Sequence, residues 1–327
     1  MTNKEMHLTD YLNKDTLEQK PTRDGFGDGL VSAGKENKDV VALCADLTDS
    51  TRISFFKKEF PERYFEIGIS EQNMASVAAG MAVSEKVPFF SSYGVFSPGR
   101  NWDQIRVTIC YNNANVKIAG AHTGISVGPD GATHQSLEDI AITRCLPNLI
   151  VLAPCDYYET KKATEVAARY KGPVYIRFAR EKTPVFTTEQ TPFEIGKANV
   201  LESGKDVTII ACGPLVYDAL LAADELLSEG IFAEVINNHT IKPLDEKTLL
   251  DSVKKTGAAV TVEEHQVMGG MGSAVCELFA KNQPVPVEMI GMQDSFGESG
   301  KPEELLKKYK MDKDSIVEAV RRVVKRK

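Results

Sequence analysis

Two histidines and an aspartate lie close together in one polar, glycine-rich segment, AGAHTGISVGPDGATHQSLED at 119–139. These residues, His122, Asp130 and His134, follow an apolar run that predicts a buried strand. Ligands of open parallel sheets bind at the carboxyl ends of the strands, which is where this segment would lie. Two imidazoles and a carboxylate could bind a metal ion, grip a sugar or move protons, and an ordinary surface loop would also accommodate them.

Glu71 occupies a comparable place in a second segment, IGISEQN at 67–73. It follows another apolar run and begins an alanine-rich helical pattern, where a carboxylate is favourable at the positive end of the helix dipole. A capping role alone would therefore account for it. Tyr93 and Phe96 come just past the next predicted strand and could hold a flat heterocycle beside Glu71, although a core pair is the other interpretation.

The elements that must position these residues follow a regular order. Short apolar runs alternate with helical patterns, which predicts an α/β fold of two domains, each a mostly parallel sheet with helices on both faces. A threonine- and proline-rich stretch without periodicity predicts a linker at 181–198, between a first domain at 1–180 and a second at 199–327. The predicted strands of the first domain are 40–47, 63–69, 87–93, 115–121, 149–154 and 173–179.

The last predicted helix, SIVEAVRRVVKRK at 315–327, begins with a sequence that could cap it. Ser315 and Glu318 have the spacing of a capping box, in which each side chain binds the other residue's backbone N–H. We therefore expect this helix to start at Ser315.

Composition and charge exclude several classes of function. The chain has 327 residues and a net charge of −7, so it has no general attraction for a nucleic-acid backbone. No apolar stretch approaches the roughly 18 residues of a membrane span, and the N-terminus lacks the apolar core of a signal peptide. The cysteines are scattered without a C-x-x-C pair, as is usual in a reducing compartment. We expect a cytoplasmic protein with no nucleic-acid or membrane partner.

Taken in order, these segments resemble the C-terminal half of transketolase, that is its pyrimidine-binding domain followed by its C-terminal domain. The segment from His122 to Gln135 is similar to the transketolase substrate loop, H-x7-D-G-x-T-H-Q, and GISEQN is similar to the segment that carries the catalytic glutamate of thiamine-diphosphate enzymes. The resemblance covers nearly the whole chain. Further matching segments are TRDGFGDGL at 22–30, ADLTDS at 45–50, PNLIVLAPCD at 147–156, IRFAR at 176–180 and VEEHQVMGGMGSAV at 262–275.

The resemblance implies that this chain binds the pyrimidine half of thiamine diphosphate. Glu71 would be catalytic: its carboxyl group would keep or share a proton with the pyrimidine nitrogen and promote the imino tautomer that leaves the nucleophilic ylide. Phe96 would stack on the pyrimidine, with Tyr93 beside it. Asp46 would lie near the thiazolium side of the cofactor.

The resemblance also implies a substrate site. His134, which would be catalytic as well, and Asp130 would hold hydroxyl and carbonyl oxygens of a sugar. Arginine makes bidentate, charge-assisted contacts with phosphate, so cationic residues are expected at the other end of the substrate. The residues implied to collect the sugar phosphate are Arg23, Ser50, His122 and Arg180.

One part of the thiamine-diphosphate pattern has no counterpart here. The segment that binds the metal and the diphosphate reads G-D-G and then, further on, N or N-N; Gly27-Asp28-Gly29 lies inside a predicted helix, and no Asn-Asn follows at the right distance. We therefore expect no metal ligands in this chain. The resemblance implies an N-terminal partner subunit that holds Mg²⁺ or Ca²⁺, in an α2β2 heterotetramer that transfers a two-carbon ketol unit from a ketose phosphate to an aldose phosphate in the pentose phosphate pathway.

Three alternatives remain at this point. Half of an enzyme like deoxyxylulose-phosphate synthase would share D-G-x-T-H-Q but would usually differ at His122 and His265. The beta subunit of a 2-oxoacid dehydrogenase would show H-S-Q-S in place of T-H-Q-S. A catalytically silent subunit could also have the same fold. Two positions depart from the transketolase pattern: Ser97–Arg100, onto which no role is carried, and Thr123, where many members have Asp.

Overall fold

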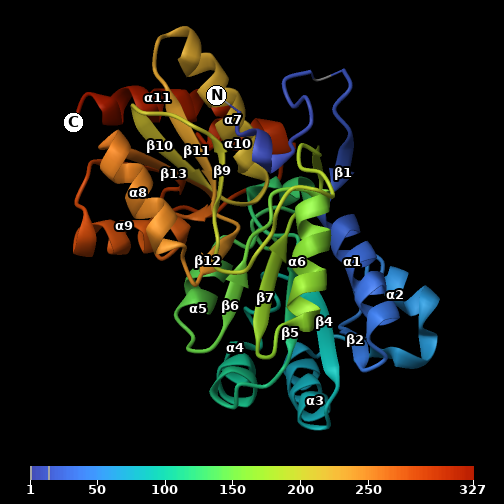
Figure 1. Cartoon of the computed structure of the whole chain (residues 1–327). Coiled ribbons are helices and arrows are strands. Elements are labelled where there is room, and N and C mark those ends of the chain that lie inside the picture. The colour runs from blue at the N-terminus through green and yellow to red at the C-terminus, as the bar shows by residue number, and fades with distance from the viewer. Residues whose placement is uncertain (1, 14) are drawn as a thin grey trace.

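Two largely parallel β-sheets, each covered by helices, form the two halves of the molecule (Figure 1). This computed structural model describes residues 2–13 and 15–327. The predicted α/β fold with two mostly parallel sheets is therefore confirmed. Within the described residues, no helix is long and apolar enough to cross a membrane.

The first sheet has seven strands in the order β12-β6-β7-β5-β4-β2-β3. All neighbouring strands in it run parallel except β12 and β6. Each of the six predicted strands of the first domain contains one strand of this sheet. The strands are β2 (Val40–Cys44), β3 (Tyr64–Glu66), β4 (Val87–Tyr93), β5 (Lys117–Ala121), β6 (Ile150–Leu152), β7 (Val174–Phe178) and β12 (Thr240–Lys242).

The second sheet has five strands in the order β14-β13-β10-β11-β9, and only β9 runs antiparallel to its neighbour. The N-terminal segment lies against this half, because the N–H of Asn3 donates to the carbonyl of Leu201 at 2.8 Å. Both ends of the chain therefore lie on the same half of the molecule (Figure 1). The strands are β9 (Asn199–Glu202), β10 (Val207–Ala211), β11 (Ala233–Asn237), β13 (Ala259–Gln266) and β14 (Val287–Met292).

One strand of the second half joins the first sheet. β12 follows β11 in the chain but forms the edge of the first sheet, antiparallel to β6. A short antiparallel pair, β1 (Gln19–Pro21) with β8 (Lys182–Pro184), places part of the segment predicted as a linker against the first half. The predicted domain limits remain a prediction, and the two halves are joined by more than one connection.

Helices lie on both sides of each sheet, at the places where the sequence shows helical periodicity. Ile105–Tyr111 winds as a π-helix, η3, that continues directly from α4. The α-helices are α1 (Thr22–Glu36), α2 (Ser54–Glu59), α3 (Glu71–Val83), α4 (Trp102–Gln104), α5 (Asp139–Arg144), α6 (Tyr157–Arg169), α7 (Val216–Ser228), α8 (Glu246–Thr256), α9 (Met271–Asn282), α10 (Pro302–Lys308) and α11 (Lys313–Val324). Short 3₁₀ turns are η1 (Lys4–Met6), η2 (Pro61–Arg63), η4 (Ile125–Asp130) and η5 (Gly213–Leu215).

The predicted start of the last helix is wrong. α11 begins at Lys313, and its cap is Asp312, whose carboxylate accepts from the N–H of Ser315 at 3.2 Å. An aspartate side chain at the cap satisfies a free N–H of the first turn. Ser315 therefore lies inside the first turn, and it donates its own hydroxyl to Asp312.

Two side chains at the carboxyl end of β13 form hydrogen bonds across the two halves to the histidine-bearing segment and the start of α5. Nε2 of His265 accepts from the backbone N–H groups of Ile140 at 3.1 Å and Ala141 at 3.3 Å, at the start of α5. Burial lowers the pKa of His265 to about 4, so the ring is neutral and its Nε2 can accept. The neighbouring Glu264 accepts from the N–H of Ser126 at 3.0 Å. Two adjacent side chains of the second sheet thereby hold this segment at Ser126 and just past its end, at Ile140 and Ala141.

A buried ion pair lies at the same junction. Nε of Arg177, on β7, donates to Oδ2 of Asp139 at 2.8 Å, and the Tyr175 hydroxyl donates to the same oxygen at 2.8 Å. Arg177 also donates to the carbonyl of Glu264 at 3.1 Å. The guanidinium therefore links β7, α5 and β13, and its charge holds the pKa of Asp139 below the usual value despite complete burial.

We expect Arg177→Met to lower the free energy of unfolding by about 3–5 kcal/mol, because it leaves the carboxylate of Asp139 buried without a counter-charge. The matched control is Arg169→Met, which breaks an exposed pair with Glu36 and should cost less than about 1 kcal/mol. Urea unfolding of both variants checks the prediction. Equal losses in the free energy of unfolding would show that the buried pair of Arg177 and Asp139 stabilises the chain no more than an exposed pair does.

Candidate functional site

Four aromatic and imidazole rings gather at the carboxyl ends of β4 and β5. Tyr93 ends β4 and Phe96 follows it, and the two rings stack with centroids 5.8 Å apart. His122, directly after β5, stacks on Tyr93 with centroids 4.0 Å apart. His134 meets Phe96 edge-on at 5.4 Å. The two predicted segments, separate in the sequence, thus form one ring cluster: Tyr93, Phe96, His122 and His134.

His122 is held in a conformation that ordinary loop residues rarely adopt. Its φ of 55° lies in the left-handed region, and its side chain is buried at 1% exposure. Burial, together with the positive charges of Arg23 and Arg180, lowers its pKa to about 3, so the imidazole is neutral near neutral pH. Its buried Nδ1 has no hydrogen-bond partner in the described chain. An unpaired buried nitrogen beside cationic groups is suited to a ligand's polar atom.

Glu71 is the first residue of α3, as predicted, and its side chain is only 4% exposed. Nη1 of Arg100 donates to both of its carboxylate oxygens, at 3.1 and 3.2 Å. The same guanidinium lies over the face of Phe96, with its carbon 4.1 Å from the ring centroid. Arg100 therefore connects the carboxylate to the ring cluster.

Two arginines, Arg23 and Arg180, lie close enough to His122 for their positive charges to lower its pKa. Arg23, in the first turn of α1, donates to the carbonyl of Ser50 at 2.9 Å, and its Nε is buried without a partner in the described chain. Arg180 donates to the carbonyl of Val127 at 3.0 Å and pairs with Asp130 at 3.7 Å. Asp130, which belongs to the histidine-bearing segment, therefore also contacts one of the cations.

Asp46 is the one predicted residue whose contacts point elsewhere. Its backbone N–H donates to Glu66 on β3 at 2.8 Å, and among the described residues no hydrogen bond or ion pair joins it to the ring cluster. The carbonyl of Ser50 accepts from Arg23, while within residues 2–13 and 15–327 no hydrogen bond of the Ser50 side chain places that side chain in the site.

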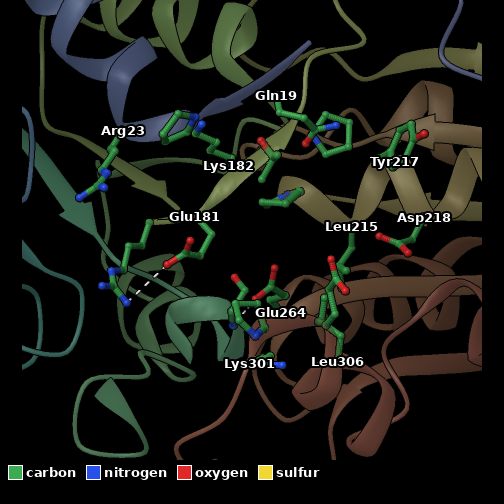
Figure 2. A pocket seen from close by; sticks show the side chains of 18 of the residues that line it. Gln19, Arg23, Glu181, Lys182, Leu215, Tyr217, Asp218, Glu264, Lys301 and Leu306 are labelled. Atoms are coloured by element: carbon green, nitrogen blue, oxygen red, sulfur yellow. Dashed lines mark hydrogen bonds and ion pairs between the residues drawn. The ribbon is translucent and has the colours of Figure 1, made fainter. Parts of the chain in front are cut away.

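The cations open onto a cleft of about 970 Å³ between the two halves (Figure 2). Arg23 and Lys182 line it from the first half. Asp218 and Leu306 lie across from them on the second half (Figure 2). Burial and the nearby carboxylates Glu264 and Asp312 raise the pKa of Asp218 to about 7. The cleft thus has a basic side next to His122 and an acidic side opposite.

Sequence reasoning missed two residues of this site. Arg52 faces the cleft with a left-handed φ of 65° and is held by Asp24 at 2.6 Å. Arg100 lay in the stretch that departs from the family pattern. One signal could have found it: a carboxylate predicted to be buried beside aromatic rings requires a counter-charge, and Arg100 is a cation close in sequence to both rings.

The described part of the chain offers no cluster of side chains that could bind a metal ion. In residues 2–13 and 15–327, no group of three or more His, Cys, Asp and Glu side chains is arranged to hold a metal ion. His122, Asp130 and His134 share the site, but the contacts of the two histidines are with rings and with the Thr133 hydroxyl, and Asp130 pairs with Arg180.

The comparisons with known proteins agree with this geometry. The family profile described as "Transketolase, pyrimidine binding domain" matches residues 18–185, half of the chain, and "Transketolase, C-terminal domain" matches residues 196–316. The chain belongs to the transketolase family. The pyrimidine-binding match includes every site residue that the resemblance implied, from Arg23 to Arg180, whereas Asp218 and Leu306 across the cleft lie in the C-terminal match.

Individual relatives cover nearly the whole chain. A Methanocaldococcus jannaschii protein named as a transketolase C-terminal section is 46% identical over 310 residues, which is 94% of this chain and 97% of that protein. A 6-deoxy-6-sulfo-D-fructose transketolase subunit from Clostridium sp. (strain MSTE9) is 40% identical over 95% of this chain and 97% of its own. A solved structure of a split gene transketolase, an inactive beta4 tetramer, has a TM-score of 0.88 at 45% identity and covers 93% of this chain and 98% of its own.

We expect Asp218 to stabilise this transketolase-family chain at low pH and to lose that contribution as the pH rises from about 4 to 7. Because the pKa of Asp218 is raised from 3.8 to about 7, the folded chain binds this proton more tightly than the unfolded chain. The stabilisation is complete below pH 4 and is lost as the pH passes 7. Asp218→Asn should make this part of the fall disappear, which denaturant unfolding at a series of pH values would measure.

The matched control for this experiment is Glu303→Gln, an exposed carboxylate on the same cleft. Its pH profile should follow the wild type. A profile of Asp218→Asn that coincides with the wild type would show that Asp218 titrates like an exposed carboxylate.

Proposed function

We propose that this chain is the C-terminal subunit of a split transketolase. It transfers a two-carbon ketol unit from a ketose phosphate to an aldose phosphate with thiamine diphosphate, and it is active only with an N-terminal partner subunit. The observation that carries this proposal is the buried Glu71 at the start of α3, joined through Arg100 to the face of Phe96 and through the ring cluster to the cations Arg23 and Arg180. A transketolase needs these groups in this order: a carboxyl and a stacking ring for the cofactor, then oxygen ligands, then phosphate ligands.

The residues present fit the pyrimidine half of the cofactor. Phe96 offers a ring face and Glu71 a carboxyl group at its edge, which suits a flat ring with a nitrogen in its plane. When bound, thiamine diphosphate supplies the carbanion that takes up the two-carbon unit. Glu71 would hold a proton between its buried carboxyl group and the pyrimidine nitrogen. Asp46 stays a prediction from the resemblance.

The substrate would extend from the ring cluster to the cations. His134 and Asp130 would hold its hydroxyl and carbonyl oxygens, and His134 would also move protons. His122 is neutral, so it would contribute a hydrogen bond rather than a charge. Positive charge for the phosphate would come from Arg23 and Arg180. The name of the Clostridium relative contains a sulfonate in place of a phosphate, and arginines suit either anion.

A partner subunit would supply what this chain does not. The relatives named as a C-terminal section, as a subunit and as a split gene product support a division of the enzyme between chains. We propose that the N-terminal subunit binds Mg²⁺ or Ca²⁺ with the diphosphate, in an α2β2 heterotetramer. The reaction would serve sugar-phosphate interconversion in the cytoplasm, as in the pentose phosphate pathway.

Glu71→Ala in the reconstituted complex should reduce turnover by several orders of magnitude, because the proton shared with the cofactor loses its carboxyl group. Binding of thiamine diphosphate should weaken far less. Steady-state kinetics and calorimetry on the same complex separate the two effects. Glu85→Gln, an exposed carboxylate just past α3, is the control; near-normal turnover of Glu71→Ala would instead favour a silent subunit.

Arg180→Ala should raise KM for phosphorylated ketoses roughly tenfold to a hundredfold more than for unphosphorylated ketoses, since a hydrogen-bonded charge pair is lost only with the former. Lys182→Ala, on the same cleft but exposed, should affect both types of substrate equally and weakly. Equal losses for both substrates in Arg180→Ala would remove Arg180 from the phosphate site.

A further inference from the structure

Arg100 contacts the two groups that the cofactor's pyrimidine would need, the carboxylate of Glu71 and the ring face of Phe96. Its Nη1 donates to the two carboxylate oxygens of Glu71, at 3.1 and 3.2 Å, and its guanidinium carbon is 4.1 Å from the centre of the Phe96 ring. In this arrangement Glu71 only accepts, and it accepts from a group that never gives up its proton. The guanidinium thus takes the place beside the Glu71 carboxylate that the pyrimidine nitrogen would need.

A guanidinium and an aminopyrimidine can make the same two contacts, one with a carboxylate and one with an aromatic ring. Each is flat, each presents nitrogen atoms in its plane, and each can place its face on an aromatic ring. The carboxylate of Glu71 and the face of Phe96 select for such a group. Both cannot occupy the same face at van der Waals distance at once.

The side chain of Arg100 is half exposed, whereas that of its partner Glu71 is buried. Glu71 is 4% exposed, and a carboxylate buried to this degree without a counter-charge is strongly disfavoured. Arg100 is 49% exposed, so its charged end can be transferred to water at little cost. The turn beneath it is fixed independently: Asn101 donates to the carbonyl of Glu71 at 3.2 Å and to Oγ of Ser97 at 3.1 Å.

We propose that Arg100 is a stand-in for the pyrimidine. It neutralises Glu71 and covers Phe96 in the chain without cofactor, and cofactor binding displaces it into solvent. Arg100 is thus a positioning residue that lowers the apparent affinity for the cofactor, because part of the binding energy is spent on displacement. This inference rests on the proposed function, since it requires that Glu71 and Phe96 hold the pyrimidine.

The test is the affinity of thiamine diphosphate, with Mg²⁺, for the complex of this chain with its partner subunit, measured by calorimetry. Arg100→Gln should bind roughly five- to thirtyfold more tightly than the wild type, the range of a partly exposed ion pair plus a cation–π contact. Arg100→Lys, which keeps the charge but not the plane, should lie between the two. Arg106→Gln, an exposed arginine on the adjacent π-helix, is the matched control and should bind like the wild type.

The outcomes separate this inference from the proposed function. Unchanged or weaker binding by Arg100→Gln, with normal binding by the wild type and by Arg106→Gln, would overturn the stand-in alone. It would mean that Arg100 helps to hold the cofactor or does not meet it. Failure of every protein to bind thiamine diphosphate would overturn the proposed function and the stand-in together.

A second measurement needs no cofactor. In the full chain, Arg100→Gln should lower the melting temperature, because it leaves Glu71 without its counter-charge. The same change in a Glu71→Gln background should lower it much less, since the pair is already broken. Equal effects of Arg100→Gln in both backgrounds would show that the pair does not stabilise the chain and would overturn the stand-in.

Discussion

The loop that carries the histidines has its shape because side chains at the end of β13 form hydrogen bonds with its backbone and with the start of α5. Glu264 accepts from Ser126 near the start of the loop, and His265 accepts from two N–H groups where α5 begins. The contact leaves no room for a side chain at Gly124, where a Cβ atom would lie 2.3 Å from a Glu264 oxygen. The second half of the chain thus acts as a support, although none of the site residues implied by the resemblance comes from it.

This support depends on groups keeping the right charge. His265 can accept only while neutral, and burial keeps it so. Arg177 and Asp139 are both buried at the same junction and are tolerated there because they face each other and because Tyr175 and the Glu264 carbonyl complete their hydrogen bonds. The junction therefore specifies how the two sheets meet, since a displaced partner would leave a charge alone in the interior.

The site itself is built on a contrast of charge. His122 is the member of the ring cluster next to the cations Arg23 and Arg180, and burial together with these two positive charges lowers its pKa and keeps it neutral. Glu71, at the other end, is also buried, but it carries its own cation in Arg100. One end of the site is thus prepared for an anion and the other for a flat group with N–H donors. In the proposed function, the sugar phosphate would meet the first requirement and the pyrimidine of thiamine diphosphate the second.

The sequence by itself determined the α/β fold, six of the seven strands of the first sheet, and the two segments that meet in the ring cluster. It did so because apolar runs and helical periods are local, and because the carboxyl ends of parallel strands meet at one edge. Tertiary structure alone decided that β12 joins the first sheet, that Asp312 rather than Ser315 caps α11, and that Asp46 contacts Glu66. It also decided the pairing of Arg100 with Glu71. Burial creates the demand for a counter-charge, and which cation meets it depends on distances between side chains that no local pattern records.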